Sequence, residues 1–284
     1  MRNQHLISAE ALQNRLGEDK LVVLEATFFL PTMERNALDE FAEDHIPTAR
    51  FFDIDTVADT ANSLPHMLPS DTQFAAQMQA LGIDADSEII VYDRSPFLSA
   101  ARCWWLFRYF GHRKIHVLNG GYKAWLAING NMQSGTPPKP TPGSFKAGKP
   151  FETDCIMLSD LQNLLNNGAP QILDARAKGR FEGTSEEPRP GLPSGHMIGA
   201  CNLPIVNILD DDGFLQPESV LTSLFEQANI DLDKPIITTC GSGVTAAGLT
   251  LALATIGVSD VRLYDGSWSE WASQPDTMIA KGPA

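Results

Sequence analysis

The sequence predicts an α/β protein of two tandem domains, each a mostly parallel sheet flanked by helices. The chain has 284 residues, which is long for one domain and enough for two that each bury a core. Short apolar runs rich in Val and Ile alternate with helical patterns, as they do in units built around a parallel sheet. The second half also repeats motifs of the first half in the same order, which indicates a duplicated domain.

Four pairs of motifs carry this repeat. In chain order they are VLEA (23–26) and ILDA (172–175), HIPTA (45–49) and HMIGA (196–200), IIVYD (89–93) and IITTC (236–240), and NGGYKAW (119–125) and DGSWSEW (265–271). The members of the last pair end 271 − 125 = 146 residues apart. The segment 132–150 between the copies is rich in Pro and Gly and favours neither helix nor strand. We therefore expect a first domain over 1–135, a linker over 136–152 and a second domain over 153–284.

Each predicted strand is a short apolar run. The runs are LVVLEA (21–26), IIVYD and KIHVLN (114–119) in the first domain, and QILDA (171–175), IITTC and VRLYD (261–265) in the second. After IITTC, the pattern VTAAGLTLALATIG predicts a buried helix that begins near Val244 and ends at a Gly257 cap. No charged residue occurs from Pro235 to Ser259, as in a membrane span, but the Gly, Ser and Thr residues there favour a strand, a turn and a buried helix.

Composition and charge exclude several classes of partner. The formal net charge is −14 and no run is rich in Lys or Arg, so neither nucleic acid nor an anionic membrane is expected to bind. The amino-terminal residues lack the continuous apolar core of an export signal. The cysteines show no metal-ligand spacing and are too few for a disulfide framework: Cys103, Cys155, Cys201 and Cys240. We therefore expect reduced thiols, no bound metal and a cytoplasmic location.

Cys240 lies where a predicted strand ends and a predicted helix begins, which is where ligands bind in open α/β sheets. Gly241 and Gly243 are able to take positive φ and turn backbone N–H groups toward an anion, and the helix dipole would stabilise a thiolate there. A buried structural cysteine is the commoner alternative, and the local sequence leaves both interpretations open. The first copy has Asp93 at this place and lacks both glycines, so the repeat favours Cys240 as the single reactive centre.

Other chemistries of cysteine and glycine-rich loops fit less well. Cysteine phosphatases need the pattern Cys-x5-Arg, but the sixth residue after Cys240 is Ala246. The loop contains only Gly-x-Gly, which is weak as a dinucleotide-binding motif. A cysteine protease needs a histidine base, and none lies near Cys240 in the sequence, although a distant one could approach in the fold.

The tandem repeat, the Cys240 loop and the DGSWSEW ending resemble the two-domain rhodanese-like sulfurtransferases over essentially the whole chain. The resemblance implies two rhodanese-like domains, with the catalytic cysteine in the second. The thiosulfate-using branch of the family typically carries basic residues where this loop has Gly and Ser, and a doubly charged donor would favour cations there. CGSGVTA is instead similar to the loop of the mercaptopyruvate branch, which implies substrate-binding roles for Gly241, Gly243, Val244 and Thr245.

The resemblance also implies that two arginines hold the donor. Arg180 and Arg189 lie nine residues apart in a Gly- and Pro-rich connection and match the family's arginines that grip the carboxylate and keto oxygen. Loop arginines are more often solvated surface residues, and we expect the neighbouring Arg176 to be structural.

In the first domain, Asp55 and His66 lie eleven residues apart. By resemblance to the mercaptopyruvate branch they form, with Ser242, a hydrogen-bonded relay across the domain interface. A lone His is more often a packed residue or part of a turn, and the spacing does not show whether the three side chains meet in the fold.

The implied activity is a two-step transfer of sulfur from 3-mercaptopyruvate, through a Cys240 persulfide, to a thiol such as that of thioredoxin, or to cyanide. It needs no metal or organic cofactor. Two alternatives stay open: a thiosulfate:cyanide sulfurtransferase, and a catalytically idle tandem module that binds partners. The ratio of activities with the two donors separates the first alternative, and a lack of persulfide with every donor would support the second.

Overall fold

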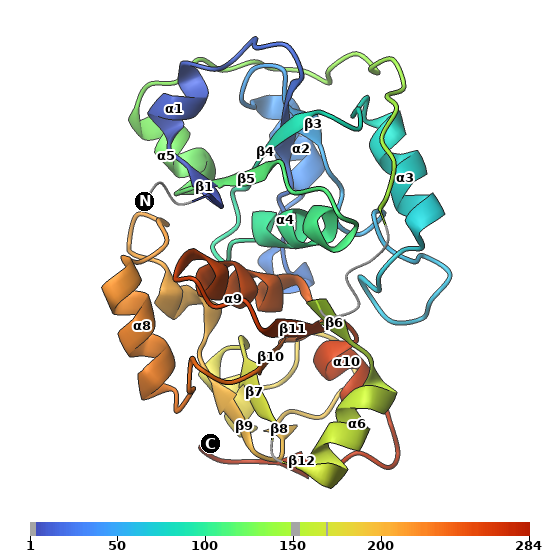
Figure 1. Cartoon of the computed structure of the whole chain (residues 1–284), viewed down its shortest axis with the longest axis vertical. Helices are drawn as coiled ribbons and strands as arrows, with labels where there is room; N and C mark the ends of the chain where they lie inside the picture. Colours follow the sequence, from blue (N-terminus) through green and yellow to red (C-terminus); the bar gives the residue numbers. More distant parts are fainter. Residues whose placement is uncertain (1–3, 149–153, 169) are drawn as a thin grey trace.

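The computed structural model describes residues 4–148, 154–168 and 170–284 and contains two five-stranded sheets, one in each half of the chain (Figure 1). The strand order is β1-β5-β4-β2-β3 in the first sheet and β6-β11-β10-β7-β9 in the second. Counted in chain order within its own sheet, each reads 1-5-4-2-3, and all neighbouring strands are parallel. The predicted fold class and the duplication are confirmed.

The α-helices and the strands of the two main sheets follow the same order in both halves, while the 3-10 helices and the pair β8–β12 do not. The first half contains β1 (Leu6–Ile7), α1 (Ala9–Gln13), β2 (Leu21–Glu25), η1 (Pro31–Met33), α2 (Ala37–Glu43), β3 (Arg50–Phe51), α3 (Asp71–Ala80), β4 (Glu88–Tyr92), α4 (Ala100–Tyr109), β5 (Ile115–Leu118) and α5 (Gly121–Ala127). The second contains β6 (Cys155–Ile156), α6 (Leu158–Asn167), β7 (Gln171–Asp174), α7 (Lys178–Glu182), β8 (His196–Met197), β9 (Ala200–Asn202), η3 (Ile205–Ile208), α8 (Glu218–Gln227), β10 (Ile236–Thr239), α9 (Val244–Thr255), β11 (Val261–Tyr264), α10 (Ser267–Trp271) and β12 (Ile279–Ala280). β12 pairs with β8 in a small antiparallel sheet.

All six predicted strands are present, as β2, β4, β5, β7, β10 and β11. They form the centre of each sheet, where both faces are covered and the sequence is mainly apolar. The strands that sequence analysis missed have only two or three residues each, which is too short to show an apolar pattern.

Helices α4 and α9 pack against each other at the junction between the domains (Figure 1). Most residues of both helices are buried, which explains why their sequences are apolar on nearly every side. The predicted helix from Val244 is confirmed: α9 ends at Thr255, and Gly257 follows with a φ of +88°. None of the helices in the described ranges is both long enough and apolar enough to span a membrane.

Residues 136–148 form no helix or strand and lie against the first domain. The N–H of Gly143 donates to the carbonyl of Gln79, and the N–H of Phe145 donates to that of Ile83. The Phe145 ring is buried and packs edge-on against Phe74. Residues 149–152 of the expected linker lie outside the described residues, and the domain boundaries at 135 and 152 stay a prediction.

Asp93 follows β4 at the position that Cys240 has after β10. Its buried carboxyl group accepts hydrogen bonds from the N–H of Ala100 (2.5 Å) and the hydroxyl of Ser99 (3.3 Å), at the start of α4. In the first domain an acidic side chain of the protein itself thus occupies the anion-binding end of the helix. Burial raises the pKa of Asp93 to about 7.

We expect Asp93→Asn to stabilise the protein increasingly as the pH rises. The pKa of Asp93 is raised to about 7 in the folded state, so folding stability is lost as pH rises from the unfolded pKa toward 7, by up to about 1.4 kcal/mol per pH unit. Asn removes this titration and keeps an oxygen acceptor. Urea unfolding between about pH 5 and 7.5 measures the difference in free energy of unfolding between variant and wild type.

Asp84→Asn is the matched control. Hydrogen bonds from Ser144 lower the pKa of Asp84, so this group titrates below the pH window of the experiment. The difference in free energy of unfolding between Asp84→Asn and the wild type should therefore not change with pH. A flat difference for Asp93→Asn as well would contradict the expectation.

Candidate active site

The loop that carries Cys240 connects β10 to α9, and Cys240 itself is only 2% exposed. The carbonyls of Cys240 and Gly241 accept hydrogen bonds from the N–H groups of Trp268 and Ser269 in α10, at 2.9 and 3.0 Å. In the described part of the chain, the N–H groups of residues 241–243 donate to no acceptor. The loop therefore points its carbonyls at α10 and leaves its amides available to an anion.

The two glycines of this loop have different reasons to be glycine. Gly243 has a φ of +78° and directly precedes α9, as expected. Gly241 does not have positive φ, so that part of the expectation is wrong. A Cβ at Gly241 would instead lie 3.0 Å from Nη2 of Arg180, so the glycine leaves room for the guanidinium.

A cavity of about 150 Å³ opens beside Cys240 at the interface of the two domains. Most of the predicted site residues line it, namely Cys240, Gly241, Ser242, Val244, Thr245, Arg180 and Arg189. The first domain contributes an apolar wall of Phe28, Leu30 and Phe97. The cavity is therefore small, and both halves of the chain build it.

Arg180 and Arg189 both reach this cavity, but their surroundings differ. Arg180 is tied to Glu187 by an ion pair of 2.6 Å. Arg189 makes no ion pair with a carboxylate of the described residues and donates a hydrogen bond to Oγ of Ser242 at 3.3 Å. Burial and the charge of Arg180 lower the pKa of Arg189. A cation held in this way is available to a carboxylate from outside the protein.

Arg176 also lines the cavity, but partners within the protein hold its guanidinium, as expected for a structural residue. Its buried guanidinium pairs with Asp174 (2.7 Å) and Glu187 (2.8 Å), and it lies 4.1 Å from the ring centre of Trp268. Glu187 therefore joins Arg176 to Arg180 and fixes the position of the second arginine.

The structure brings Asp55, His66 and Ser242 into one chain of hydrogen bonds. Nε2 of His66 lies 2.8 Å from Oδ1 of Asp55, and Nδ1 lies 2.9 Å from Oγ of Ser242. The hydrogen bond with His66 lowers the pKa of Asp55, which is therefore an acceptor at neutral pH. Nε2 of His66 then carries the proton, and Nδ1 accepts from the Ser242 hydroxyl.

Sequence analysis missed the residues that support these hydrogen bonds between Asp55, His66 and Ser242. Phe28 places its ring edge-to-face with His66, with 4.9 Å between the ring centres. Arg102 and Asp265 form a buried ion pair of 2.8 Å behind it. The signal for Arg102 was a cation within the apolar run SAARCWWLF, most of which lies in α4.

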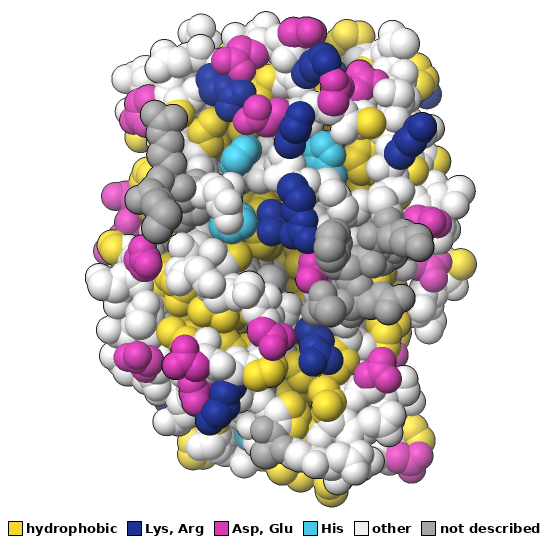
Figure 2. All heavy atoms as spheres, viewed as in Figure 1, with side chains coloured by type: hydrophobic (Ala, Val, Ile, Leu, Met, Phe, Trp, Pro, Cys, Tyr) yellow, Lys and Arg dark blue, Asp and Glu magenta, His cyan; other side chains and the backbone are white. Residues whose placement is uncertain are grey.

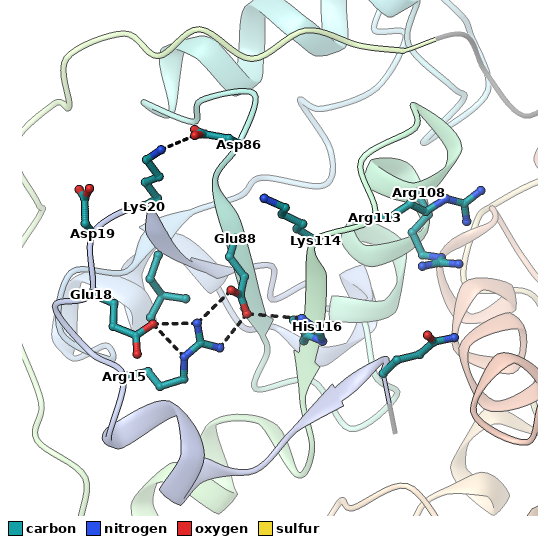
Figure 3. A pocket seen from close by; sticks show the side chains of 12 residues that line it. Arg15, Glu18, Asp19, Lys20, Asp86, Glu88, Arg108, Arg113, Lys114 and His116 are labelled. Carbon is teal, nitrogen blue, oxygen red and sulfur yellow. Dashed lines mark hydrogen bonds and ion pairs between the residues drawn. The ribbon is translucent and has the colours of Figure 1, made fainter. Parts of the chain in front are cut away.

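A larger hollow, of about 710 Å³, lies in the first domain at the amino-terminal ends of β2, β4 and β5 (Figure 3). Arg15 pairs there with Glu18 and Glu88, and Lys20 with Asp86. On the face drawn in Figure 2, Lys, Arg and His side chains gather in the upper domain with Asp and Glu around them. No cysteine lines this hollow, and open parallel sheets bind ligands at the carboxyl ends of their strands, so we assign the chemistry to the cavity beside Cys240.

Within the described residues, no three His, Cys, Asp or Glu side chains are grouped to hold a metal ion.

Comparison with known proteins agrees with this geometry. The model of the rhodanese-like domain matches residues 8–128 and again 157–274. The chain is 38% identical to the 3-mercaptopyruvate sulfurtransferase of Escherichia coli over 281 residues, which cover 98% of this chain and 99% of that protein. It is 40% identical to the 3-mercaptopyruvate sulfurtransferase of Rattus norvegicus over 281 residues, 96% of this chain and 93% of that protein. A thiosulfate sulfurtransferase of Cricetulus griseus is also 40% identical, over 282 residues with the same shares.

Two solved structures show the same arrangement of domains. The Tum1 protein of Saccharomyces cerevisiae superposes with a TM-score of 0.90 at 31% identity, covering 100% of both chains. SseA of Escherichia coli, described as a 3-mercaptopyruvate sulfotransferase, superposes with a TM-score of 0.84 at 36% identity, covering 93% of this chain and 98% of that one. The chain therefore belongs to the family of two-domain rhodanese-like sulfurtransferases.

Proposed function

We propose that this protein is a 3-mercaptopyruvate sulfurtransferase that carries the sulfur as a persulfide on Cys240. In the first step the Cys240 thiolate attacks the donor's sulfur; an S–S bond forms and the C–S bond breaks. The electron pair of the C–S bond leaves with the enolate of pyruvate, which takes up one proton. In the second step a thiolate, such as that of thioredoxin, or cyanide attacks the outer sulfur, and Cys240 leaves as a thiolate.

The observation that carries this proposal is the hydrogen-bonded chain from Asp55 through His66 to Ser242, two residues from Cys240. A pyruvate enolate has to take up a proton when it leaves. Sulfite, the leaving group of thiosulfate, is a stable anion and needs none. A proton relay beside the nucleophile therefore supports a mercapto-keto acid as the donor.

The remaining groups of the cavity suit a donor with one carboxylate. Arg189, which has no carboxylate partner in the described residues, supports binding of that carboxylate, with Arg180 beside it. The free amides of Gly241 and Gly243, followed by the first turn of α9 at Val244 and Thr245, support a nest for the persulfide anion.

The test is to incubate the protein with 3-mercaptopyruvate in the absence of an acceptor. We expect one equivalent of pyruvate and a mass gain of one sulfur atom on the peptide that contains Cys240, removed when thioredoxin or cyanide is added. In steady state we expect kcat/KM for 3-mercaptopyruvate to exceed that for thiosulfate by about tenfold or more, because the loop has no cation for a second negative charge.

Equal or better turnover of thiosulfate would overturn the proposed donor. Thiosulfate has to be tested because the thiosulfate sulfurtransferase of Cricetulus griseus is also 40% identical to this chain. Failure of every donor to place sulfur on Cys240 would instead favour a catalytically idle binding module.

A further inference from the structure

Arg102 is the buried cation of α4 and reaches from the first domain into the second. Its side chain is almost completely enclosed, and Nη2 forms a 2.8 Å ion pair with Asp265, which follows β11 and is enclosed as well. Replacing a buried ion pair by apolar residues is often neutral or stabilising, so stability alone does not account for this pair. Its other contacts indicate what it does.

Both members of the pair hold the segment that contains His66. Nη2 of Arg102 donates to the backbone carbonyl of His66, and Oδ2 of Asp265 accepts the N–H of Leu68 at 2.7 Å. His66 has a φ of +60°, a left-handed conformation that a residue with a Cβ adopts only when its surroundings impose it. These two hydrogen bonds lie on the two sides of Met67 and fix the backbone from which the imidazole projects.

The same pair also contacts the loop of the nucleophile. A Cβ at Gly243 would lie 2.9 Å from Nη1 of Arg102 and 3.2 Å from the carbonyl oxygen of Asp265. Gly243 adjoins Ser242, so the pair supports both ends of the 2.9 Å contact between Ser242 Oγ and His66 Nδ1. One ion pair thus sets the distance between groups that belong to different domains.

We propose that Arg102 and Asp265 are positioning residues for the proton relay, which hold His66 at hydrogen-bonding distance from Ser242. This inference rests on the proposed function. The His66 carbonyl and Oδ1 of Asp265 both contact Nη2 of Arg102. The rigid, planar guanidinium holds that nitrogen in place, whereas the ammonium of lysine lies at the end of a flexible stem and would position the two groups less precisely. Arg102 touches neither the donor's cavity nor Cys240, so its effect passes through His66.

The experiment compares Arg102→Lys in two backgrounds, wild type and His66→Ala. In the wild-type background we expect kcat for pyruvate release to fall by about tenfold or more, because a small misplacement of a proton donor is costly, while KM for 3-mercaptopyruvate changes by less than about twofold. In the His66→Ala background the same substitution should change kcat by less than about twofold, since the relay is already absent.

Arg108→Lys is the matched control, because Arg108 lies on the same helix over the ring of Trp104 and is absent from the cavity lining. It should leave kcat and KM unchanged. If Arg102→Lys does not fold, Asp265→Asn carries the same comparison, since it keeps the shape of the side chain and an oxygen for Leu68. An equal loss in both backgrounds would overturn the inference, as would a loss confined to KM.

These measurements distinguish failure of the proposed function from failure of the positioning role of Arg102 and Asp265. If the wild-type protein releases no pyruvate from 3-mercaptopyruvate, the proposed function fails. If it does release pyruvate but the effect of Arg102→Lys is independent of His66, the proposed function stands and the positioning role fails.

Discussion

Replacement of Cys240 by serine is expected to reduce pyruvate release from 3-mercaptopyruvate by about a thousandfold or more. A serine hydroxyl is far less acidic than a thiol, so even the free amides of the loop and Arg189 leave it protonated at neutral pH. An oxygen at this position also cannot form the persulfide that both half-reactions share. Pyruvate release coupled to lactate dehydrogenase measures the rate, and mass spectrometry of the intact protein measures the bound sulfur.

Cys201→Ser is the control for this experiment. Cys201 lies in β9, is partly buried, and does not line the cavity beside Cys240. It should retain turnover close to that of the wild type and should still gain one sulfur atom. Turnover that survives in Cys240→Ser, or sulfur that moves to Cys201, would contradict the assignment of Cys240 as the nucleophile.

The second large effect is expected for Arg189→Met, which should lower kcat/KM for 3-mercaptopyruvate by about a hundredfold, mostly through KM. A charge-assisted hydrogen bond contributes about 1.5–3 kcal/mol, and Arg189 is a cation of the cavity that forms no ion pair with a carboxylate of the described residues. Methionine keeps the length of the side chain and removes the charge. Steady-state kinetics at several donor concentrations separate KM from kcat.

Lys178→Met makes the same change of charge near the site but outside the cavity. Lys178 is the first residue of α7, and its exposed ammonium group lies 3.7 Å from Glu182. We expect its kinetic constants to match those of the wild type. If Lys178→Met and Arg189→Met weakened donor binding equally, the effect would come from the net charge of the protein and not from a specific contact.

The central part of the fold could be predicted because it depends on local patterns. The central strands are mostly apolar and buried, so all six were found, and α9 was found from its apolar run and its Gly257 cap. Cys240 was placed correctly between β10 and α9 for the same reason. The edge strands were missed because two or three residues are too few to show the apolar pattern of a strand.

The geometry of the site depends on contacts between distant residues, and the sequence alone does not contain those distances. His66 and Ser242 are 176 positions apart, and the resemblance to a family proposed their contact where spacing could not. Arg102 and Asp265 went unnoticed for the same reason, although a cation within the apolar first part of α4 was a usable signal. The expected positive φ of Gly241 was wrong because the glycine there serves a neighbouring guanidinium and not the turn.

The cavity wall of Phe28 and Phe97, together with His66, comes from the half of the chain that has no cysteine nucleophile. Each half therefore holds only part of the site: the nucleophile belongs to one copy, and the imidazole and the apolar wall belong to the other. The complete site exists only where the two copies meet, so the duplicated fold acts as one catalytic unit and not as two.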